Sequence, residues 1–218
     1  MDRPADSTVY RTVHRAMVAG AERLAGAVGQ ADVSHRGRRL DALVRWASGF
    51  TAELRWHQAE EDVHAFPALV ERVPAAAAIV ARLETDHRDL AGLLDELAPS
   101  LAALAATSVP FDEAQRRAAA TAGLLSDLVA AHVFDEDVNV APLIERHLSY
   151  EDFAAEQRAA ARRLPLRDAA FTIPWLLEGR TPAERDQLLG LLPRRVSLAG
   201  RVGEGHYRRL VRRAFGDA

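Results

Sequence analysis

Residues 43–64 read LVRWASGFTAELRWHQAEEDVH, and one set of positions in this stretch steps alternately by four and three residues. The set comprises Leu43, Ala47, Phe50, Leu54, His57, Glu61 and His64. Such spacing is typical of the buried stripe of an amphipathic α-helix. His57 and Glu61, four residues apart, should lie one above the other on the same helical face. An imidazole and a carboxylate so placed can bind a metal ion.

The same pair of residue types recurs later in the chain. His132 and Glu136 repeat the spacing of His57 and Glu61, 75 residues further on. A single histidine precedes each pair, because His14 lies 43 residues before His57 and another histidine, at position 87, lies 45 residues before His132. The chain therefore contains two copies of one pattern: a histidine, a long gap, and a His-x-x-x-Glu pair.

The same periodicity predicts helices in the first two thirds of the chain, and no stretch is convincing as a strand. The predicted helices are residues 8–28, a second helix ending at Pro67, a third starting near Ala75, and a fourth after the break at 107–110. Pro99 is expected to kink or end the third helix. Four amphipathic helices with short connections predict an all-α fold, an antiparallel up-down-up-down bundle over residues 1–147.

Residues 148–218 are expected to form a helical extension packed on that bundle. Ser149 with Asp152, and Thr181 with Glu184, have the spacing of helix N-caps. Residues 173–177 are apolar enough to pack against the bundle. The last predicted helix is basic, with Arg194, Arg195, Arg201, Arg208, Arg209, Arg212 and Arg213. These arginines are expected to form a solvated face with salt bridges to the bundle, and a surface for an anionic partner is the lesser alternative.

Composition excludes several kinds of site. The 218 residues include no cysteine, which excludes disulfides, thiolate zinc sites and iron-sulfur clusters, and the 28 basic residues are all arginine, which excludes a Schiff-base lysine. A net charge of −3 argues against recruitment of nucleic acid or anionic lipid by the whole molecule. No apolar run reaches the roughly 18 to 20 residues of a membrane span, and no leader is evident at the amino terminus, so a cytoplasmic location without membrane contact is expected.

The pattern places four histidines and two glutamates at core positions, where uncompensated charges would cost several kcal/mol each. If the four helices bring these residues to one level, two histidines per ion and two shared carboxylates can hold a pair of cations. A bridging oxo or hydroxo group would complete a fifth position and leave a sixth open. This mixed nitrogen and oxygen donor set suits iron, manganese or zinc, and a carboxylate-bridged pair with open positions favours iron.

These residues resemble the hemerythrin-like HHE cation-binding domains, which are four-helix bundles that hold two non-haem iron ions. The resemblance covers about residues 8–147 and rests on His14, on His57-Gln-Ala-Glu-Glu61 with Phe66-Pro67-Ala-Leu69, on His87, and on His132-Val-Phe-Asp-Glu136. It implies a metal-ligand set of His14, His57, Glu61, His87, His132 and Glu136, with Glu61 and Glu136 bridging.

The sequence departs from the oxygen-carrying members of that family. They have a His-x-x-x-His pair on the third helix, whereas Leu83 and Ala91 lie four residues before and after His87 here. The missing histidine favours redox chemistry or sensing over reversible oxygen carriage. The carriers also have a His-x-x-x-x-Asp frame, which His132 and Asp137 reproduce, but Glu136 is the preferred ligand because it repeats the first pair.

A ferritin-like di-iron site is the competing architecture, because Glu61 with His64 and Glu84 with His87 form Glu-x-x-His motifs. That interpretation is weaker, since Val129 occupies the corresponding position before His132.

The favoured function is therefore a di-iron protein that binds or turns over a small oxidant, namely O2, hydrogen peroxide or NO, with peroxide disproportionation as the preferred catalytic form. A separate redox partner is compatible with this function. The alternatives are an iron or oxygen sensor without turnover, and a structural bundle that holds zinc or no metal.

Overall fold

The computed structural model describes residues 3–216, and helices account for nearly all of them. The helices are α1 (Thr8–Gly29), η1 (Val33–His35), α2 (Arg38–Glu60), η2 (Glu61–Ala65), α3 (Phe66–Arg72), η3 (Pro74–Ala76), α4 (Ala77–Ala105), α5 (Phe111–Asn139), α6 (Ala141–His147), α7 (Tyr150–Arg163), α8 (Leu166–Leu177), α9 (Pro182–Leu191) and α10 (Arg194–Phe215). Within residues 3–216 no strand occurs, and an isolated bridge between Pro4 and Ser149 is the one extended pairing. The all-α class is confirmed.

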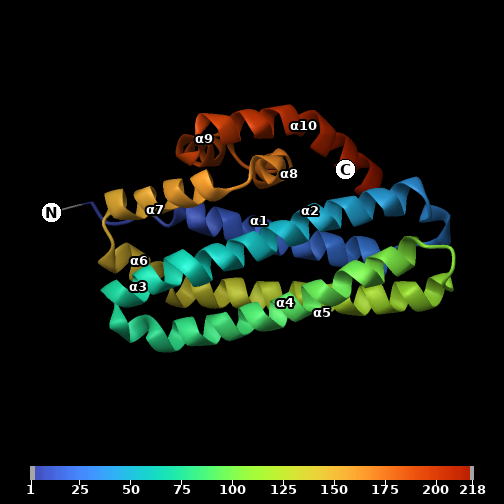
Figure 1. The fold of residues 1–218 in the computed structure, drawn as a ribbon, viewed down its shortest axis with the longest axis horizontal. Coiled ribbons are helices and arrows are strands. Elements are labelled where there is room, and N and C mark those ends of the chain that lie inside the picture. The colour runs from blue at the N-terminus through green and yellow to red at the C-terminus, as the bar shows by residue number, and fades with distance from the viewer. Residues whose placement is uncertain (1–2, 217–218) are drawn as a thin grey trace.

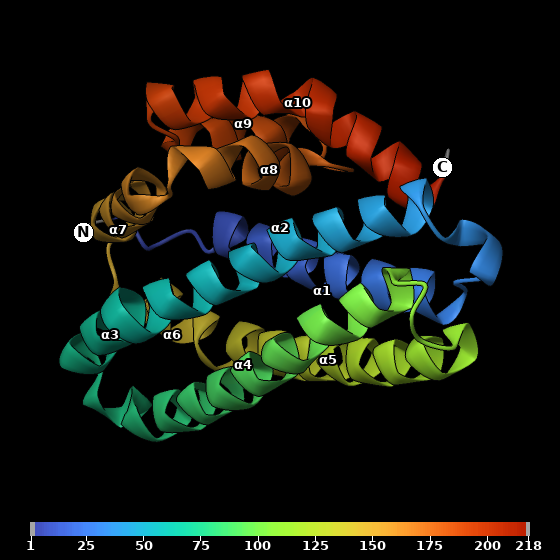
Figure 2. The same cartoon turned by 45° about the vertical axis from the view of Figure 1, so that its right-hand side comes forward.

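Four long helices, α1, α2, α4 and α5, lie side by side, and the chain reverses direction between each and the next (Figure 1). Helix α5 packs against both α1 and α4, and α2 packs against α4. Figure 2 shows α8, α9 and α10 gathered on the α2 side of these helices. Among the described residues, no helix combines the length and the apolar character needed to cross a bilayer.

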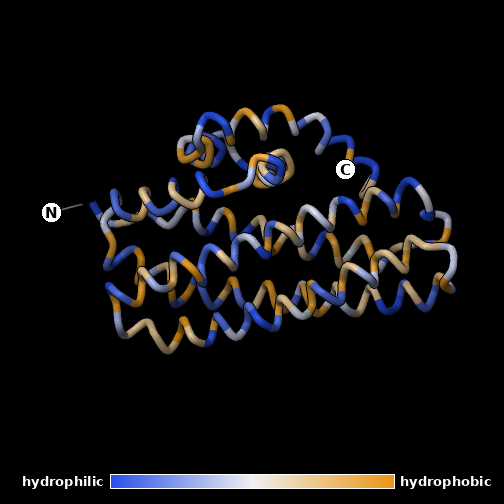
Figure 3. Tube along the Cα trace, in the orientation of Figure 1, coloured by the Kyte–Doolittle hydropathy of each residue, from blue (hydrophilic) through white to orange (hydrophobic). Residues whose placement is uncertain are grey.

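The predicted apolar stripe of α2 is buried. Leu43, Ala47, Phe50 and Leu54 are each at most 2% exposed and belong to one hydrophobic cluster with residues of α1, α4 and α5. Along each long helix, apolar and hydrophilic positions alternate in short groups, as an amphipathic helix requires (Figure 3). The last position of the predicted stripe, His64, is instead exposed.

Two prolines lie inside helical stretches, and the prediction is wrong for Pro67. Pro67 does not end the second helix, because a π-helical segment at Glu61–Ala65 leads directly into α3, which continues to Arg72. Proline lacks the N–H for an α-helical bond and its ring crowds the carbonyl four residues earlier. The wider π turn, in which Phe66 N–H donates to the Glu61 carbonyl, occurs just before this position. Pro99 lies inside α4 and does not end it.

The extension packs on α2, mainly through α8 and α10. Trp175 of α8 and Tyr207 of α10 share the hydrophobic cluster of Trp46, and Ile173 belongs to a smaller cluster against which Trp56 packs. The two predicted N-caps are confirmed, since the side chains of Ser149 and Thr181 accept hydrogen bonds from the backbone N–H three residues on.

The predicted salt bridges from the basic last helix to the bundle are wrong for the part of the chain that the structure describes. The seven arginines are exposed, and only Arg208 forms an ion pair, with Glu204 of its own helix. Most ion pairs between the bundle and the extension instead join an arginine of the bundle to a glutamate of the extension. Two arginines of α1 form such pairs, Arg15 with Glu184 and Arg23 with Glu178.

Gly203 sets the distance between α10 and α8. A Cβ atom at this position would overlap the backbone of Ala170, which cannot move aside as a flexible side chain could. We expect Gly203→Ala to lower the free energy of unfolding by about 1 to 3 kcal/mol, the usual cost of overpacking, and to lower Tm in a thermal melt. Gly205→Ala is the matched control, since Arg209 is its nearest neighbour at an ordinary 3.6 Å. Equal melting temperatures for the two variants would show that the close crossing of α8 and α10 does not stabilise the protein.

Candidate metal centre

The six residues singled out in the sequence come together in the interior of the four long helices. Each is at most 8% exposed. They are His14 of α1, His57 of α2, Glu61 at the start of the π segment, His87 of α4, and His132 and Glu136 of α5. Since α2 is α-helical up to Glu60, the spacing of His57 and Glu61 remains that of one helical turn.

The six side chains form two overlapping groups that share both carboxylates. One group contains His14 and His57, the other contains His87 and His132, and Glu61 and Glu136 belong to both. Within each group the nearest ligand-type atoms all lie within 4.8 Å of one another. This separation leaves room for one ion among four donors in each group.

The two oxygens of Glu61 face different histidines. Oε1 lies 3.2 Å from His57 Nε2, and Oε2 lies 3.5 Å from His87 Nε2. One carboxylate thus reaches into both groups, as a bridging ligand must. Glu136 occupies the other shared position, where its Oε2 lies 3.3 Å from His14 Nε2 and 3.5 Å from His132 Nε2.

Several atoms at the centre of this cluster have no hydrogen-bond partner in the described structure. They are His14 Nε2, His57 Nε2, Glu61 Oε2 and both carboxylate oxygens of Glu136. Buried polar atoms left without a partner destabilise a fold, and an ionised carboxylate does so most. Imidazole nitrogens and carboxylate oxygens are also the donors that a first-row transition metal accepts. The residues present therefore fit a pair of metal ions.

Three of the imidazoles are also hydrogen-bonded, through Nδ1, to carboxylates that lie outside the cluster. Asp137 lies 2.8 Å from His14 Nδ1, and Asp62 lies 2.7 Å from His87 Nδ1. Asp86 lies 3.5 Å from His132 Nδ1. A carboxylate at Nδ1 fixes the ring so that Nε2 points inward, which is the usual arrangement around metal-binding histidines.

Sequence reasoning missed two of these three carboxylates. They are Asp62, which bonds His87, and Asp86, which bonds His132. Each missed aspartate bonds a histidine on another helix, so helical spacing carries no signal for it. Asp137 appeared only as an alternative ligand, and the structure places it against His14.

The charges of the cluster are strongly coupled. Burial and then the nearby Glu61 charge raise the pKa of Glu136 well above its ordinary value. Burial alone would raise the pKa of Glu61 too, but the adjacent His57 and His87 hold it well below its ordinary value. Burial lowers the pKa of His132 to about 4. A neutral imidazole is the form that binds a metal, so His132 needs no deprotonation at pH 7.

Tyr10 joins the cluster from α1, one turn before His14. Its hydroxyl donates a hydrogen bond of 3.3 Å to Glu61 Oε1, and its ring centroid lies 4.0 Å from that of His14. Burial, and then the surrounding carboxylates, raise the pKa of Tyr10 well above its ordinary value, so the phenol keeps its proton. Helical spacing alone gives no sign of this role, because the contact with Glu61 joins two different helical segments.

The ferritin-like alternative does not fit the structure. It requires His64 and Glu84 as donors, yet neither lies in the groups of potential metal ligands in the described chain. His64 is exposed and Glu84 is only half-buried. The π segment that follows Glu61 also breaks the helical spacing on which the Glu61 and His64 motif depends.

The contact of Asp137 with His14 predicts a graded effect on metal binding. Asp137→Asn removes the carboxylate that orients one imidazole, so we expect metal stoichiometry to stay the same while affinity falls about 10- to 100-fold. Titration against a competing chelator measures both quantities. Asp135→Asn is the control on the same helix, since Asp135 pairs with Arg82 away from the cluster. Complete loss of one ion in Asp137→Asn, with both ions retained in Glu136→Gln, would instead make Asp137 the ligand.

A family model described as the hemerythrin HHE cation binding domain matches residues 6–144, a range that includes all six clustered residues. No curated protein and no solved structure gives a significant match to the chain.

Proposed function

Because the chain belongs to the hemerythrin HHE cation-binding domain family, we propose that it is a non-haem di-iron protein that binds or turns over a small oxidant. Helices α1, α2, α4 and α5 then form the up-down-up-down bundle of that family, and the buried His/Glu cluster is its metal centre. The oxidants proposed are O2, hydrogen peroxide and NO, with peroxide disproportionation as the catalytic form.

The observation that carries this proposal is the pair of overlapping groups that share Glu61 and Glu136. His14 and His57 would hold one ion, and His87 and His132 the other. Four protein donors for each ion leave coordination positions free for an external molecule. When bound, a pair of iron ions supplies electrons by cycling between ferrous and ferric states.

The surrounding side chains keep the centre ordered and cover part of it. Asp62, Asp86 and Asp137 orient three imidazoles, and the Tyr10 hydroxyl offers a proton donor beside Glu61. The ring of Phe66 stacks on His87, with centroids 5.7 Å apart and planes 8° from parallel. An apolar wall of this kind protects a redox centre from bulk water.

The absence of a fifth histidine supports turnover or sensing over storage. Leu83, one turn before His87, is fully buried and belongs to an apolar cluster with Phe66 and Leu69. The protein therefore offers no nitrogen donor at the position that oxygen carriers of the family use, and one more coordination position is open to an external ligand.

Peroxide and gas responses of the iron-loaded protein test this function. Hydrogen peroxide should be consumed with release of one O2 for every two peroxides, and NO or O2 should change the optical spectrum. Metal-free protein is the control for both measurements. Protein with two irons per chain that neither consumes peroxide nor changes its spectrum with NO or O2 would contradict the proposal.

A sensor without turnover is the second candidate, and the docking of the extension favours it. Helices α8 and α10 pack on α2, which carries His57, so a change at the metal centre can reach the extension through one helix. A sensor predicts that iron loading or oxidation changes the rate of proteolysis in residues 148–216 without peroxide consumption. Unchanged cleavage in the metal-free, ferrous and ferric states would exclude this alternative.

A further inference from the structure

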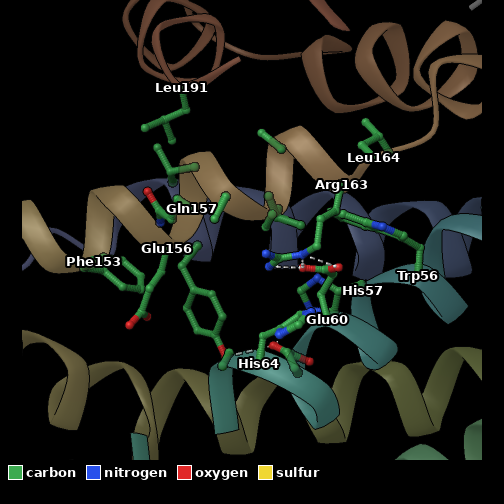
Figure 4. A pocket seen from close by; sticks show the side chains of 18 of the residues that line it. Trp56, His57, Glu60, His64, Phe153, Glu156, Gln157, Arg163, Leu164 and Leu191 are labelled. Atoms are coloured by element: carbon green, nitrogen blue, oxygen red, sulfur yellow. Dashed lines mark hydrogen bonds and ion pairs between the residues drawn. The ribbon is translucent and has the colours of Figure 1, made fainter. Parts of the chain in front are cut away.

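A cavity of about 420 Å³ lies between the bundle and the extension and reaches the metal centre from one side. His57, Glu61 and Tyr10 form its inner end, whereas His87 and His132 do not line it. Figure 4 shows His57 and Glu60 on the bundle side of this space and Leu164 and Leu191 on the side of the extension. We propose that this cavity binds a neutral, apolar organic molecule, with one end of that molecule against His57 and Glu61.

The size of the cavity exceeds what a small oxidant needs. A water molecule occupies about 30 Å³ of the liquid, and O2, NO and peroxide are of similar size. A volume of about 420 Å³ instead falls in the range of roughly 300 to 1,000 Å³ in which proteins bind organic ligands. The occupant that fits is therefore a molecule of many heavy atoms.

The walls of the cavity are almost entirely apolar and come from both parts of the chain. Val13 and Leu69 contribute from the bundle, and Leu164, Ile173 and Leu188 contribute from the extension. Leu164, Ile173 and Leu188 are each at most 6% exposed, so packing within the protein holds these side chains in place. Filling such a space with a hydrocarbon or aromatic group removes apolar surface from water, which stabilises the complex.

The charges of the lining select against an anionic ligand. Of the lining residues in the described chain, Arg163 alone carries a permanent positive charge, and Glu60 already accepts its hydrogen bonds at 2.9 and 3.0 Å from Nε and 2.5 Å from Nη2 (Figure 4). The carboxyl groups of Glu53, Glu61 and Glu156 also border the cavity. In the metal-free protein a carboxylate or sulfonate head group would find no unpaired cation there, since His57 Nε2 lies 3.2 Å from Glu61 Oε1, whereas a neutral molecule needs none.

This inference goes beyond the proposed oxidant chemistry, because binding in the cavity does not require iron. The probe is N-phenyl-1-naphthylamine, a neutral aromatic molecule whose fluorescence rises in apolar surroundings. We expect saturable binding of one probe per chain to both the metal-free and the iron-loaded protein. From the metal-free protein, neutral 1-decanol should displace the probe, and decanoate should do so at least 10-fold less well.

Filling the cavity from either wall should abolish this binding. Ala160→Trp fills it from α7 and Ala68→Phe fills it from α3, and each should weaken probe binding at least 10-fold. Ala155→Trp is the matched control, because Ala155 lies on the exposed face of α7 outside the lining. Circular dichroism and thermal melts establish that all three variants fold.

Three results would overturn the proposal. One is the absence of saturable probe binding to the wild-type protein in either metal state. Another is an equal loss of binding in Ala155→Trp and in both filled variants, which would place the probe elsewhere. In the metal-free protein, displacement by decanoate as effective as that by decanol would contradict a neutral ligand. A protein that binds the probe but contains no iron would refute the di-iron function and leave this site intact.

Discussion

His57→Ala protein purified from iron-replete cells should contain one iron ion or fewer per chain and should lose the near-ultraviolet absorption of a bridged ferric pair. His57 supplies one of only two imidazoles in its group, and its partner carboxylate Glu61 is shared with the second group. Removing a direct donor should cost more than the 10- to 100-fold typical of an outer partner, and the second ion should bind less tightly as well.

The matched control for this variant is His64→Ala. His64 continues the same helical stripe in the sequence, yet it is exposed and lies outside both groups. His132→Ala should reproduce the loss from the opposite side of the cluster. Metal content by mass spectrometry and the absorption spectrum check all three variants. Two irons per chain in His57→Ala, or an equal loss in His64→Ala, would contradict the assignment of His57.

Glu136→Gln should change stability in opposite directions with and without metal. Glu136 is 0% exposed, and neither of its carboxylate oxygens has a hydrogen-bond partner in the described structure. Glutamine keeps the shape of the side chain but cannot ionise, so the metal-free variant should be at least as stable as the metal-free wild type. The same change removes a shared donor, so metal should stabilise the variant much less.

The size of the metal effect follows from binding linkage. At a free metal concentration of about 1,000 times Kd, a single bound ion adds about 4 kcal/mol. For a chain of this length that corresponds to a rise in Tm of roughly 8 to 16 °C. Glu136→Gln should lose most of this rise, whereas Glu113→Gln, an exposed substitution on the same helix, should keep it. A full metal-dependent rise in Glu136→Gln would show that Glu136 is not a ligand.

The pH dependence of the metal-free protein gives an independent check on Glu136. Burial and the Glu61 charge raise the pKa of Glu136 in the folded state. A carboxyl group with a raised pKa binds its proton more tightly when folded, so its contribution to stability is largest below the pKa of the unfolded chain and is lost as pH rises toward the raised value. Metal-free Glu136→Gln should therefore lose less stability between pH 5 and pH 8 than the metal-free wild type.

Helical periodicity predicted the residues that lie in the core, and for that reason it also predicted the buried His/Glu cluster. His14, His57, His87 and His132 fall on stripes that are otherwise apolar, so their burial follows from the same spacing as that of Leu54 or Phe50. Burying this many polar side chains together costs free energy, and only a few arrangements, among them a bound metal ion, can compensate that cost. The sequence pattern alone therefore identified all six members of the cluster.

Features that depend on contacts between distant segments were not predictable in this way. Asp62 and Asp86 each bond a histidine on another helix, and their neighbours along the chain give no sign of it. The rule that proline ends a helix failed at Pro67, because a π turn directly before it lets the helix continue. The cavity arises only where α7, α8 and α9 approach the bundle, so no single segment encodes it.

Metal content of the wild-type protein tests the central claim most directly. Protein produced in iron-replete medium, purified without added metal and measured by mass spectrometry together with its absorption spectrum, should contain two irons per chain and show near-ultraviolet charge-transfer bands. Zinc in place of iron, or a folded protein with no bound metal and no such bands, would contradict the account.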